Sequence, residues 1–294
     1  VIFILLFLFS FVASAGASDI DHILLHDGAQ RAYFVHTPPS YRPKTEKLPL
    51  VIVMHGGGGK AKNAIIQTGM NDVADKNNFI AVYPEGYASG PKDKFHTWNA
   101  GSCCGSAMEN NSDDVGFISQ MIDAMAQNYN IDTKRVYATG HSNGSMMAYR
   151  LACELSDKIT AIAPNAGQSV IEGCKQSRPV PVLHFHGTAD KCALYNGGSE
   201  CGGCFASMMG GLGRFMKHDT WACDPVPESL AAHAKVNGCS AETKIIFTQG
   251  DTICERWQGC PAGASVTLCT MNGAGHTWAR TNAGETGGKF CADK

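Results

Sequence analysis

The chain has 294 residues, of which 44% are hydrophobic and 17% charged, and its formal net charge at pH 7 is -2. A chain of this length can bury a full core, and a single α/β domain explains it more simply than two domains. The small net charge and the absence of long Lys or Arg runs argue against a nucleic-acid or anionic-membrane partner. We therefore expect an enzyme-sized globular protein that acts on small or neutral substrates.

The first residues, VIFILLFLFSFVASAGAS, form a continuous apolar run that ends in small residues. This pattern is typical of a secretory signal peptide, with cleavage after Ala15 or Ala17. A membrane anchor is disfavoured because the run is short and the chain turns polar from Asp19. The initiator Met and a basic region are missing, so we expect a truncated N-terminus. We predict a signal peptide over 1–17, a single domain over 18–294, and a secreted, extracellular protein.

Thirteen cysteines fit an oxidising compartment and several disulfides, with at least one cysteine left unpaired or paired between chains. The close pairs Cys103–Cys104 and Cys201–Cys204 could suggest zinc, but a matching second CxxC is absent, so disulfides are favoured. The best single pair is Cys239 with Cys260, because one ends a predicted helix and the other lies in a turn between two late strands.

Apolar strand-like runs alternate with helix-like segments along the chain. Strands are predicted over 31–41, 48–59, 78–86, 135–140, 181–187, 244–250 and 265–271, and all of them except the first are expected to be buried. Helices are predicted over 63–76, 113–129, 142–153 and 228–237. This alternation predicts an α/β fold in which a mostly parallel sheet is covered by helices on both faces. Functional groups are then expected at the carboxyl ends of the strands.

The segment 192–227 breaks this alternation, because it is rich in Gly, Cys and Met and has no clean period. We interpret it as an inserted loop pinned by disulfides, since it is too short and glycine-rich to bury a core of its own.

The stretch VYATGHSNGSMMAYRLA places Ser142 between Gly140 and Gly144, after a predicted strand and before a predicted helix. A strand that turns directly into a helix strains the residue at the corner, and its neighbours two positions away must lack side chains. The hydroxyl then projects at a helix N-terminus, where negative charge is stabilised. We predict that Ser142 is a nucleophile and not part of a merely structural turn.

A serine nucleophile needs a histidine base and a carboxylate that orients the base. Asp190 follows the strand that ends in HFHG, and His276 follows the strand that ends near Gly273. The chain order Ser142, Asp190, His276 is that of α/β-hydrolases. A parallel sheet would bring the three residues to one edge.

The run from His55 to Gly59 also follows a strand and predicts an oxyanion hole. We expect the backbone N–H of Gly57, with that of Gly58 close behind, to act together with that of Asn143. A phosphate-binding loop is disfavoured because the expected Lys-Ser/Thr pair is absent.

Other polar residues are assigned structural roles. His184 and His186 lie in a buried strand, and His141 is expected to pack beneath the serine turn. Asp113 and Asp114 precede an apolar helix and suit N-capping.

Five motifs now support a resemblance: VMHGGGG, WNAGSCCG followed by DDVGFI, GHSNGSMMAYRLAC, HFHGTAD and GHTW. Together they resemble, from Arg31 to Trp278, the family that groups secreted feruloyl esterases with polyhydroxybutyrate-depolymerase-type esterases, within carbohydrate esterase family 1. The resemblance implies an α/β-hydrolase fold, the triad and oxyanion hole above, and no metal or organic cofactor. It also implies that Trp98 and Trp278 lie near the cleft as substrate-binding residues, although core packing is an equal alternative.

The function that we expect is a secreted serine esterase that acts on feruloyl or related hydroxycinnamoyl esters of plant cell-wall polysaccharide. The alternatives are a polyhydroxyalkanoate or polyester depolymerase and an acetyl xylan esterase. The family's usual Pro after GHTW is Ala279 here, and the insert over 192–227 is longer than expected, so specificity is the open point. A peptidase would need a further domain, and a binding protein derived from a hydrolase would be expected to lack a triad member. No obligate protein partner is inferred.

Overall fold

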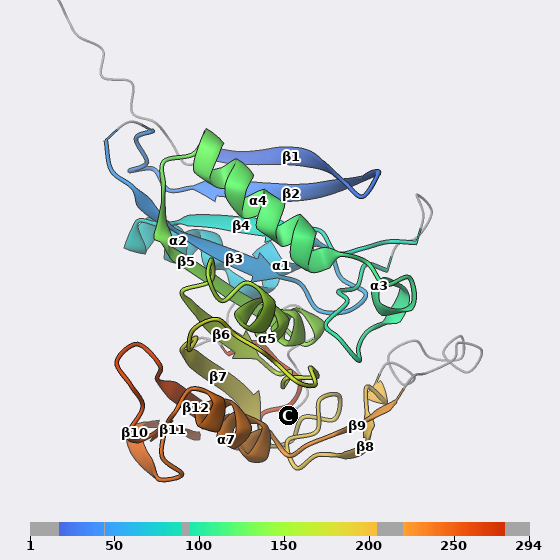
Figure 1. The fold of residues 1–294 in the computed structure, drawn as a ribbon, viewed down its shortest axis with the longest axis vertical. Coiled ribbons are helices and arrows are strands. Elements are labelled where there is room, and N and C mark those ends of the chain that lie inside the picture. The colour runs from blue at the N-terminus through green and yellow to red at the C-terminus, as the bar shows by residue number, and fades with distance from the viewer. Residues whose placement is uncertain (1–17, 44, 90–94, 205–219, 280–294) are drawn as a thin grey trace, which may run out of the picture.

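The computed structural model describes residues 18–43, 45–89, 95–204 and 220–279 (Figure 1). The predicted signal peptide lies outside these residues. The strands are β1 (Ser18–His26), β2 (Ala29–Thr37), β3 (Leu48–Met54), β4 (Ile80–Pro84), β5 (Ile131–His141), β6 (Ala161–Asn165), β7 (Val182–Gly187), β8 (Gly198–Cys201), β9 (Trp221–Cys223), β10 (Thr243–Gln249), β11 (Thr252–Trp257) and β12 (Val266–Met271). The helices are α1 (Ala61–Thr68), α2 (Met70–Asn77), α3 (Gly105–Glu109), α4 (Asp114–Asn128), α5 (Asn143–Glu154) and α7 (Val226–Val236).

A ten-stranded sheet in the order β1-β2-β4-β3-β5-β6-β7-β12-β11-β10 forms the centre of the fold. The six strands from β4 to β12 in this order are parallel, with Leu50 opposite Val136 and Val182 opposite Val266. The two strands at each edge are antiparallel. The carboxyl ends of the parallel strands therefore meet at one edge, on the right in Figure 1.

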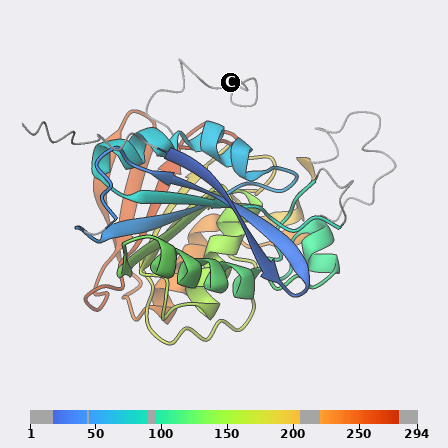
Figure 2. The same cartoon turned by 90° about the horizontal axis from the view of Figure 1, so that it is seen from above.

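Helices cover both faces of the sheet, as the sequence predicts (Figure 2). Helix α1 packs over β3 and β4 and α2 over β2 and β4 on one face, and α4, α5 and α7 cover the other. In α4 the buried residues Ile118, Met121, Ile122 and Met125 recur every three or four positions, so one stripe of the helix enters the core. The fold is that of an α/β-hydrolase.

Several elements differ from the sequence predictions. The predicted buried strand 244–250 is β10, and all of its residues are exposed because it forms the edge of the sheet. The predicted helix 63–76 is two helices, which meet at Gly69. The sequence does not predict the strands β1, β6, β8, β9 and β11 or the helix α3.

The two aspartates before α4 have different roles. Asp113 caps the helix, because its carboxylate accepts the Gly116 N–H at 2.9 Å. Asp114 is fully buried and forms an ion pair of 2.6 Å with Arg31, so its predicted capping role is wrong.

Six disulfides join twelve cysteines of the described residues, which fits an oxidising compartment. The predicted pair Cys239–Cys260 is confirmed. Cys201 and Cys204 have different partners, Cys223 and Cys192, so disulfides rather than zinc ligation account for this pair. These two bonds pin the described part of the insert, where β8 and β9 pair antiparallel. No helix in the described ranges is long and apolar enough to cross a membrane.

Candidate active site

Ser142 occupies a strained turn between β5 and α5. Its φ is 56° and its ψ is -120°, a conformation that non-glycine residues rarely adopt. A Cβ atom at Gly140 would lie 2.5 Å from the backbone of Gly144, and one at Gly144 would lie 2.5 Å from the His55 carbonyl oxygen. Both glycines are therefore needed for the turn to pack against the end of β3, as the sequence predicts.

Asp190 and His276 follow β7 and β12 and lie together at the same edge of the sheet. The Nδ1 atom of His276 donates to Asp190 Oδ2 at 2.8 Å. The other carboxylate oxygen accepts the N–H groups of Cys192 at 2.7 Å and Ala193 at 2.9 Å. Asp190 is only 5% exposed, so these bonds fix a carboxylate that has little contact with solvent.

The electrostatic setting keeps Asp190 ionised. Burial alone would raise the pKa of its carboxyl, but hydrogen bonds from His186 and His276 outweigh burial and lower the pKa below its usual value. An ionised Asp190 can hold the imidazole of His276 with Nδ1 protonated, which leaves Nε2 to accept a proton.

Asn165, the last residue of β6, connects the serine turn to the histidine loop. Its backbone carbonyl accepts the Ser142 N–H at 3.0 Å. Its side-chain nitrogen donates to the Thr277 carbonyl at 2.7 Å, and its side-chain oxygen accepts the Ala279 N–H at 2.9 Å. Asn165 therefore fixes Thr277 and Ala279, in the segment that directly follows His276, relative to the proposed nucleophile.

His141 adds a second contact between these segments. Its ring centroid lies 4.7 Å from that of His276, and the residue directly precedes Ser142. Burial, followed by the proximity of His276, holds the pKa of His141 well below its usual value, so the ring beside His276 is neutral. The ends of β5, β7 and β12 thus gather the three predicted triad residues at one edge of the sheet.

The glycine loop contacts the serine turn directly, since a Cβ atom at Gly56 would lie 3.3 Å from Ser142 Cβ. Among the described residues no acceptor is found for the N–H of Gly57 or of Asn143, so both can bind an external oxygen. The Gly58 N–H instead donates to the His96 carbonyl at 2.8 Å. Gly58 is therefore corrected from a candidate donor to a residue that anchors the loop.

Trp98 lies beneath the site with no exposed surface. Its indole N–H donates to the His55 carbonyl oxygen at 3.0 Å, and its backbone binds the side chain of Asn143. Because Trp98 is buried, it does not offer the expected surface to a substrate. It instead supports the start of the glycine loop and the side chain of Asn143. Trp278, two positions after His276 in the chain, is half-buried and has surface to offer to a ligand.

His55 anchors the start of the glycine loop in one protonation state. Its Nε2 atom accepts the Gly86 N–H at 2.9 Å, so Nδ1 carries the hydrogen that is donated to the Gly56 carbonyl at 2.7 Å. Burial lowers the pKa of His55 to about 4, with partial opposition from the bond to Gly56. The ring is neutral at pH 7.

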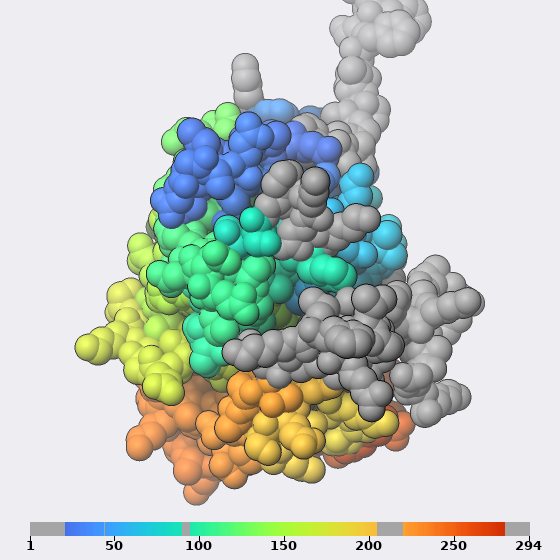
Figure 3. Space-filling view, turned by 90° about the vertical axis from the view of Figure 1, so that its right-hand side faces the viewer, coloured from blue at the N-terminus to red at the C-terminus, as the bar shows by residue number. Residues whose placement is uncertain are grey.

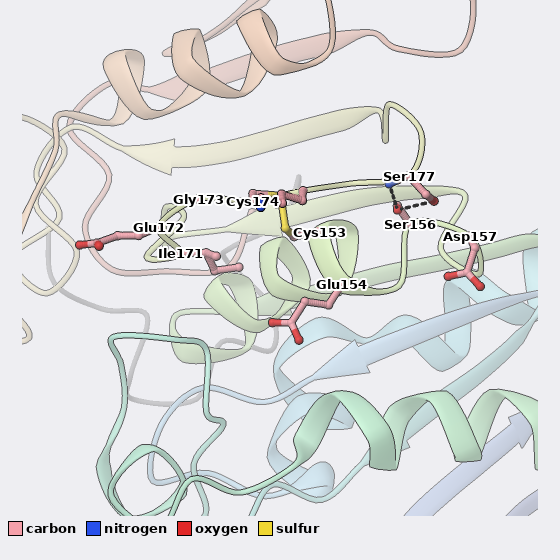
Figure 4. Close-up of a pocket in the computed structure, with 10 residues that line it drawn as sticks. Cys153, Glu154, Ser156, Asp157, Ile171, Glu172, Gly173, Cys174 and Ser177 are labelled. Atoms are coloured by element: carbon pink, nitrogen blue, oxygen red, sulfur yellow. Dashed lines mark hydrogen bonds between the residues drawn. A yellow bond between two sulfur atoms is a disulfide. The ribbon is translucent and has the colours of Figure 1, made fainter.

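The edge that carries these residues faces the viewer in Figure 3, where the segment around α3 and the segment of β8 and β9 both reach the surface. The middle of the insert, residues 205–219, lies outside the described residues. A separate open hollow of about 600 Å³ lies at the opposite end of α5, against the Cys153–Cys174 disulfide (Figure 4). Its lining includes Glu154, Asp157 and Glu172 and none of the triad residues.

A family model described as esterase PHB depolymerase matches residues 31–202, which is more than half of the chain. The chain belongs to this family. The matched range includes the glycine loop, the serine turn and Asp190, while His276 lies beyond it.

Individual relatives agree with this family. Feruloyl esterase B of Piromyces equi is 34% identical over 235 residues, which are 78% of this chain and 39% of the relative. The bifunctional acetylxylan esterase/xylanase XynS20E of Neocallimastix patriciarum is 34% identical over 57% of this chain and 22% of the relative. This esterase-family chain thus spans well under half the length of both. The putative esterase NocK of Nocardia uniformis subsp. tsuyamanensis is 30% identical over 85% of this chain and 71% of the relative.

A solved acetyl xylan esterase from Aspergillus awamori shares the fold, with a TM-score of 0.61 and 16% identity over 90% of this chain and 96% of that one. Sequence reasoning missed Asn165, and it gave substrate binding and core packing equal weight at Trp98. Asn165 follows a strand that was not predicted, and an Asn at a strand end was its only signal. Trp98 was selected as an aromatic residue, and nothing in the local sequence indicates that its indole binds His55.

Proposed function

We propose that this chain is a secreted serine carboxylic-ester hydrolase that acts on feruloyl or related hydroxycinnamoyl esters of plant cell-wall polysaccharide. The observation that carries the proposal is the 2.8 Å hydrogen bond between His276 and a buried Asp190, on strand ends that lie beside the strained Ser142 turn. We propose no metal or organic cofactor, because the three side chains suffice for acyl transfer.

In this mechanism Ser142 Oγ attacks the ester carbonyl carbon while His276 Nε2 takes the hydroxyl proton. Asp190 holds the imidazole and stabilises its charged form. His276 then returns the proton to the leaving alcohol, which leaves an acyl group on Ser142. Water attacks this acyl-enzyme by the same route in reverse and releases the carboxylic acid.

The oxyanion that forms in each step is proposed to bind the N–H groups of Gly57 and Asn143. Both donors belong to segments whose packing is fixed, so little reorganisation is needed when the charge develops. Removal of one such donor typically costs about 3 kcal/mol of transition-state stabilisation. Gly58 has no part in this step, since its N–H is bonded to His96.

The hydroxycinnamoyl specificity is the finer part of the proposal. Feruloyl esterase B of Piromyces equi supports it by similarity, at 34% identity. The half-buried Trp278, two positions after His276 in the chain, offers an aromatic surface on which a flat phenolic ring could pack. The six disulfides and the predicted signal peptide support secretion.

The deciding experiment is an assay of the purified chain on methyl ferulate, acetyl xylan and a short polyester. We expect kcat/KM to be highest on methyl ferulate, whereas preference for acetyl xylan or polyester would favour an acetyl xylan esterase or a depolymerase. Ser142→Ala should lower turnover by more than about 1000-fold. Ser229→Ala in α7 is the matched control and should keep it. No hydrolysis of any ester by the folded wild type would refute the proposal.

A further inference from the structure

A buried row of three polar side chains runs from α5 to the loop that carries Asp190. The Tyr149 hydroxyl lies 2.9 Å from His184 Nδ1, and His184 Nε2 lies 2.9 Å from His186 Nδ1. His186 Nε2 in turn lies 2.7 Å from the Ala193 carbonyl oxygen. All three residues are buried, with at most 3% of their surface exposed. The row therefore crosses the protein interior.

Both ends of the row belong to segments that carry proposed catalytic residues. Tyr149 lies in α5, which begins directly after Ser142. At the other end, His186 Nε2 lies 3.4 Å from Asp190 Oδ2, and the Ala193 N–H donates to Asp190 Oδ1 at 2.9 Å. His186 thus reaches Asp190 directly and also through Ala193.

The position of each hydrogen follows from the last acceptor. The Ala193 carbonyl cannot donate, so His186 Nε2 carries a hydrogen. In the neutral row His186 Nδ1 then accepts from His184 Nε2, and His184 Nδ1 accepts from the Tyr149 hydroxyl. Burial favours neutral side chains, because it holds the pKa of His184 well below and that of Tyr149 well above the usual value. Every donor therefore points toward the Asp190 loop.

Directional bonds in a buried row restrict movement more than apolar packing does. A donor or acceptor that is buried without a partner lowers the free energy of unfolding. A shift of β7 or of the Asp190 loop would break one of these hydrogen bonds and leave its donor and acceptor unpaired in the interior. The row therefore specifies one placement of the Asp190 loop relative to α5, the helix that follows Ser142.

We propose that His186 and His184, together with Tyr149, are positioning residues that keep the Asp190 carboxylate aligned with His276. The inference rests on the proposed function, since it assigns Asp190 the role of orienting the base. A row that only filled the core would contribute to stability but would leave the bond between Asp190 and His276 unchanged.

Three variants test the row. His186→Met removes both ring nitrogens, whereas His186→Gln keeps one N–H that can reach Ala193. Tyr149→Phe deletes the first donor at almost constant volume. The matched control is His233→Met, because this histidine of α7 packs its ring 5.8 Å from Tyr149 but lies outside the row.

Two readouts separate positioning from packing: kinetics on p-nitrophenyl acetate, and the far-downfield proton resonance of the His276 Nδ1–H in the resting enzyme. For His186→Met we expect kcat to fall about 10- to 100-fold with less than about threefold change in KM. The resonance should move upfield or broaden. His186→Gln should recover part of both losses, and Tyr149→Phe should give a smaller loss. His233→Met should lower thermal stability alone.

A folded His186→Met variant with wild-type kcat and resonance would overturn the inference. If that variant does not fold, Tyr149→Phe decides in the same way, because an unchanged kcat and resonance would leave no positioning role. The resonance needs no turnover. It therefore decides the inference even if the wild type hydrolyses no ester, a result that would overturn the proposed function instead.

Discussion

The side-chain amide of Asn143 forms two hydrogen bonds with the backbone of Trp98, 45 positions away in the chain. Its oxygen accepts the Trp98 N–H at 2.7 Å, and its nitrogen donates to the Trp98 carbonyl at 3.0 Å. The Trp98 indole in turn binds the carbonyl of His55, where the glycine loop begins. Trp98 therefore joins the two segments that supply the proposed oxyanion donors, Gly57 and Asn143.

The first prediction concerns Asn143→Ala, which keeps the backbone N–H but removes both bonds to Trp98. The unpaired Trp98 backbone should lower the free energy of unfolding by about 1 to 3 kcal/mol. We expect kcat to fall about tenfold, with a smaller change in KM, because the donor is less well oriented. Steady-state kinetics and urea unfolding measure the two effects. An unchanged kcat would show that the two hydrogen bonds between the Asn143 side chain and Trp98 do not orient the oxyanion hole.

The second prediction distinguishes support from substrate contact at Trp98. Trp98→Phe retains an aromatic ring but loses the indole N–H that binds His55. Since the ring is fully buried, we expect similar losses of kcat/KM on methyl ferulate and p-nitrophenyl acetate, of about three- to tenfold. A loss confined to methyl ferulate would restore the original interpretation of Trp98 as a substrate-binding residue.

Sequence patterns were sufficient to find the triad candidates because each follows a strongly apolar strand that ends in glycine or a turn. Gly140 and Gly144 are needed because side chains there would clash where the tight turn at Ser142 packs against β3, so a pattern of nearby residues is enough to predict them. Gly58 shows the limit of this reasoning. Its N–H is consumed by His96, a partner 38 positions away, and no local pattern reports that bond.

Strand predictions failed where tertiary position overrides local composition. The run in β10 is apolar enough to suggest a buried strand, yet Ile245 and Phe247 are 57% and 46% exposed, since β10 is the last strand of the sheet in the described part of the chain. β6 is five residues long and contains Pro164, so it has little strand signal. Its omission also hid Asn165, the residue that ties Ser142 to the loop of His276.

The third prediction concerns stability in mild acid. The pKa of His55 is lowered to about 4 by burial, whereas an unfolded histidine titrates near about 6.5. Between these pH values the unfolded chain binds a proton that the folded protein does not, so the free energy of unfolding falls as the pH falls. The contribution of His55 reaches about 3 kcal/mol below pH 4.

Urea unfolding of the wild type and of His55→Gln at pH 7, 6, 5 and 4.5 measures this contribution. The variant should lose less stability than the wild type across the range, because it lacks the titration of His55. It should still lose some stability, because His141 and His184, whose pKa values burial also lowers, continue to contribute. Parallel curves for the two proteins would exclude a folding-linked proton at His55.

The fourth prediction concerns the buried ion pair of Arg31 with Asp114, which also accepts the Asn99 N–H at 2.8 Å. Arg31→Met should lower the free energy of unfolding by about 3 to 5 kcal/mol, because it leaves a buried carboxylate without its cation. The double variant Arg31→Met, Asp114→Leu should lose less than the sum of the single variants. A loss below about 0.5 kcal/mol for Arg31→Met would mean that the pair is not buried in solution.

The fifth prediction compares two disulfides that close loops of different function. Cys192 forms a disulfide with Cys204, and its backbone N–H donates to Asp190 Oδ1 at 2.7 Å. Cys239 and Cys260 join α7 to a turn between late strands and make no contact with the triad. Each pair replaced by Ala should lower stability by about 2 to 4 kcal/mol, since each disulfide restricts the unfolded chain.

Only the Cys192 and Cys204 replacement should also lower kcat on p-nitrophenyl acetate, by about tenfold, because the backbone that holds Asp190 loses its tether. The small acetyl ester is the right substrate, since it needs little beyond the triad and the oxyanion hole. The Cys239 and Cys260 replacement controls for general loosening of the fold. If both double variants keep wild-type kcat at a temperature where they are fully folded, the Cys192 disulfide serves stability alone, and the hydrogen bonds around Asp190 hold the carboxylate without it.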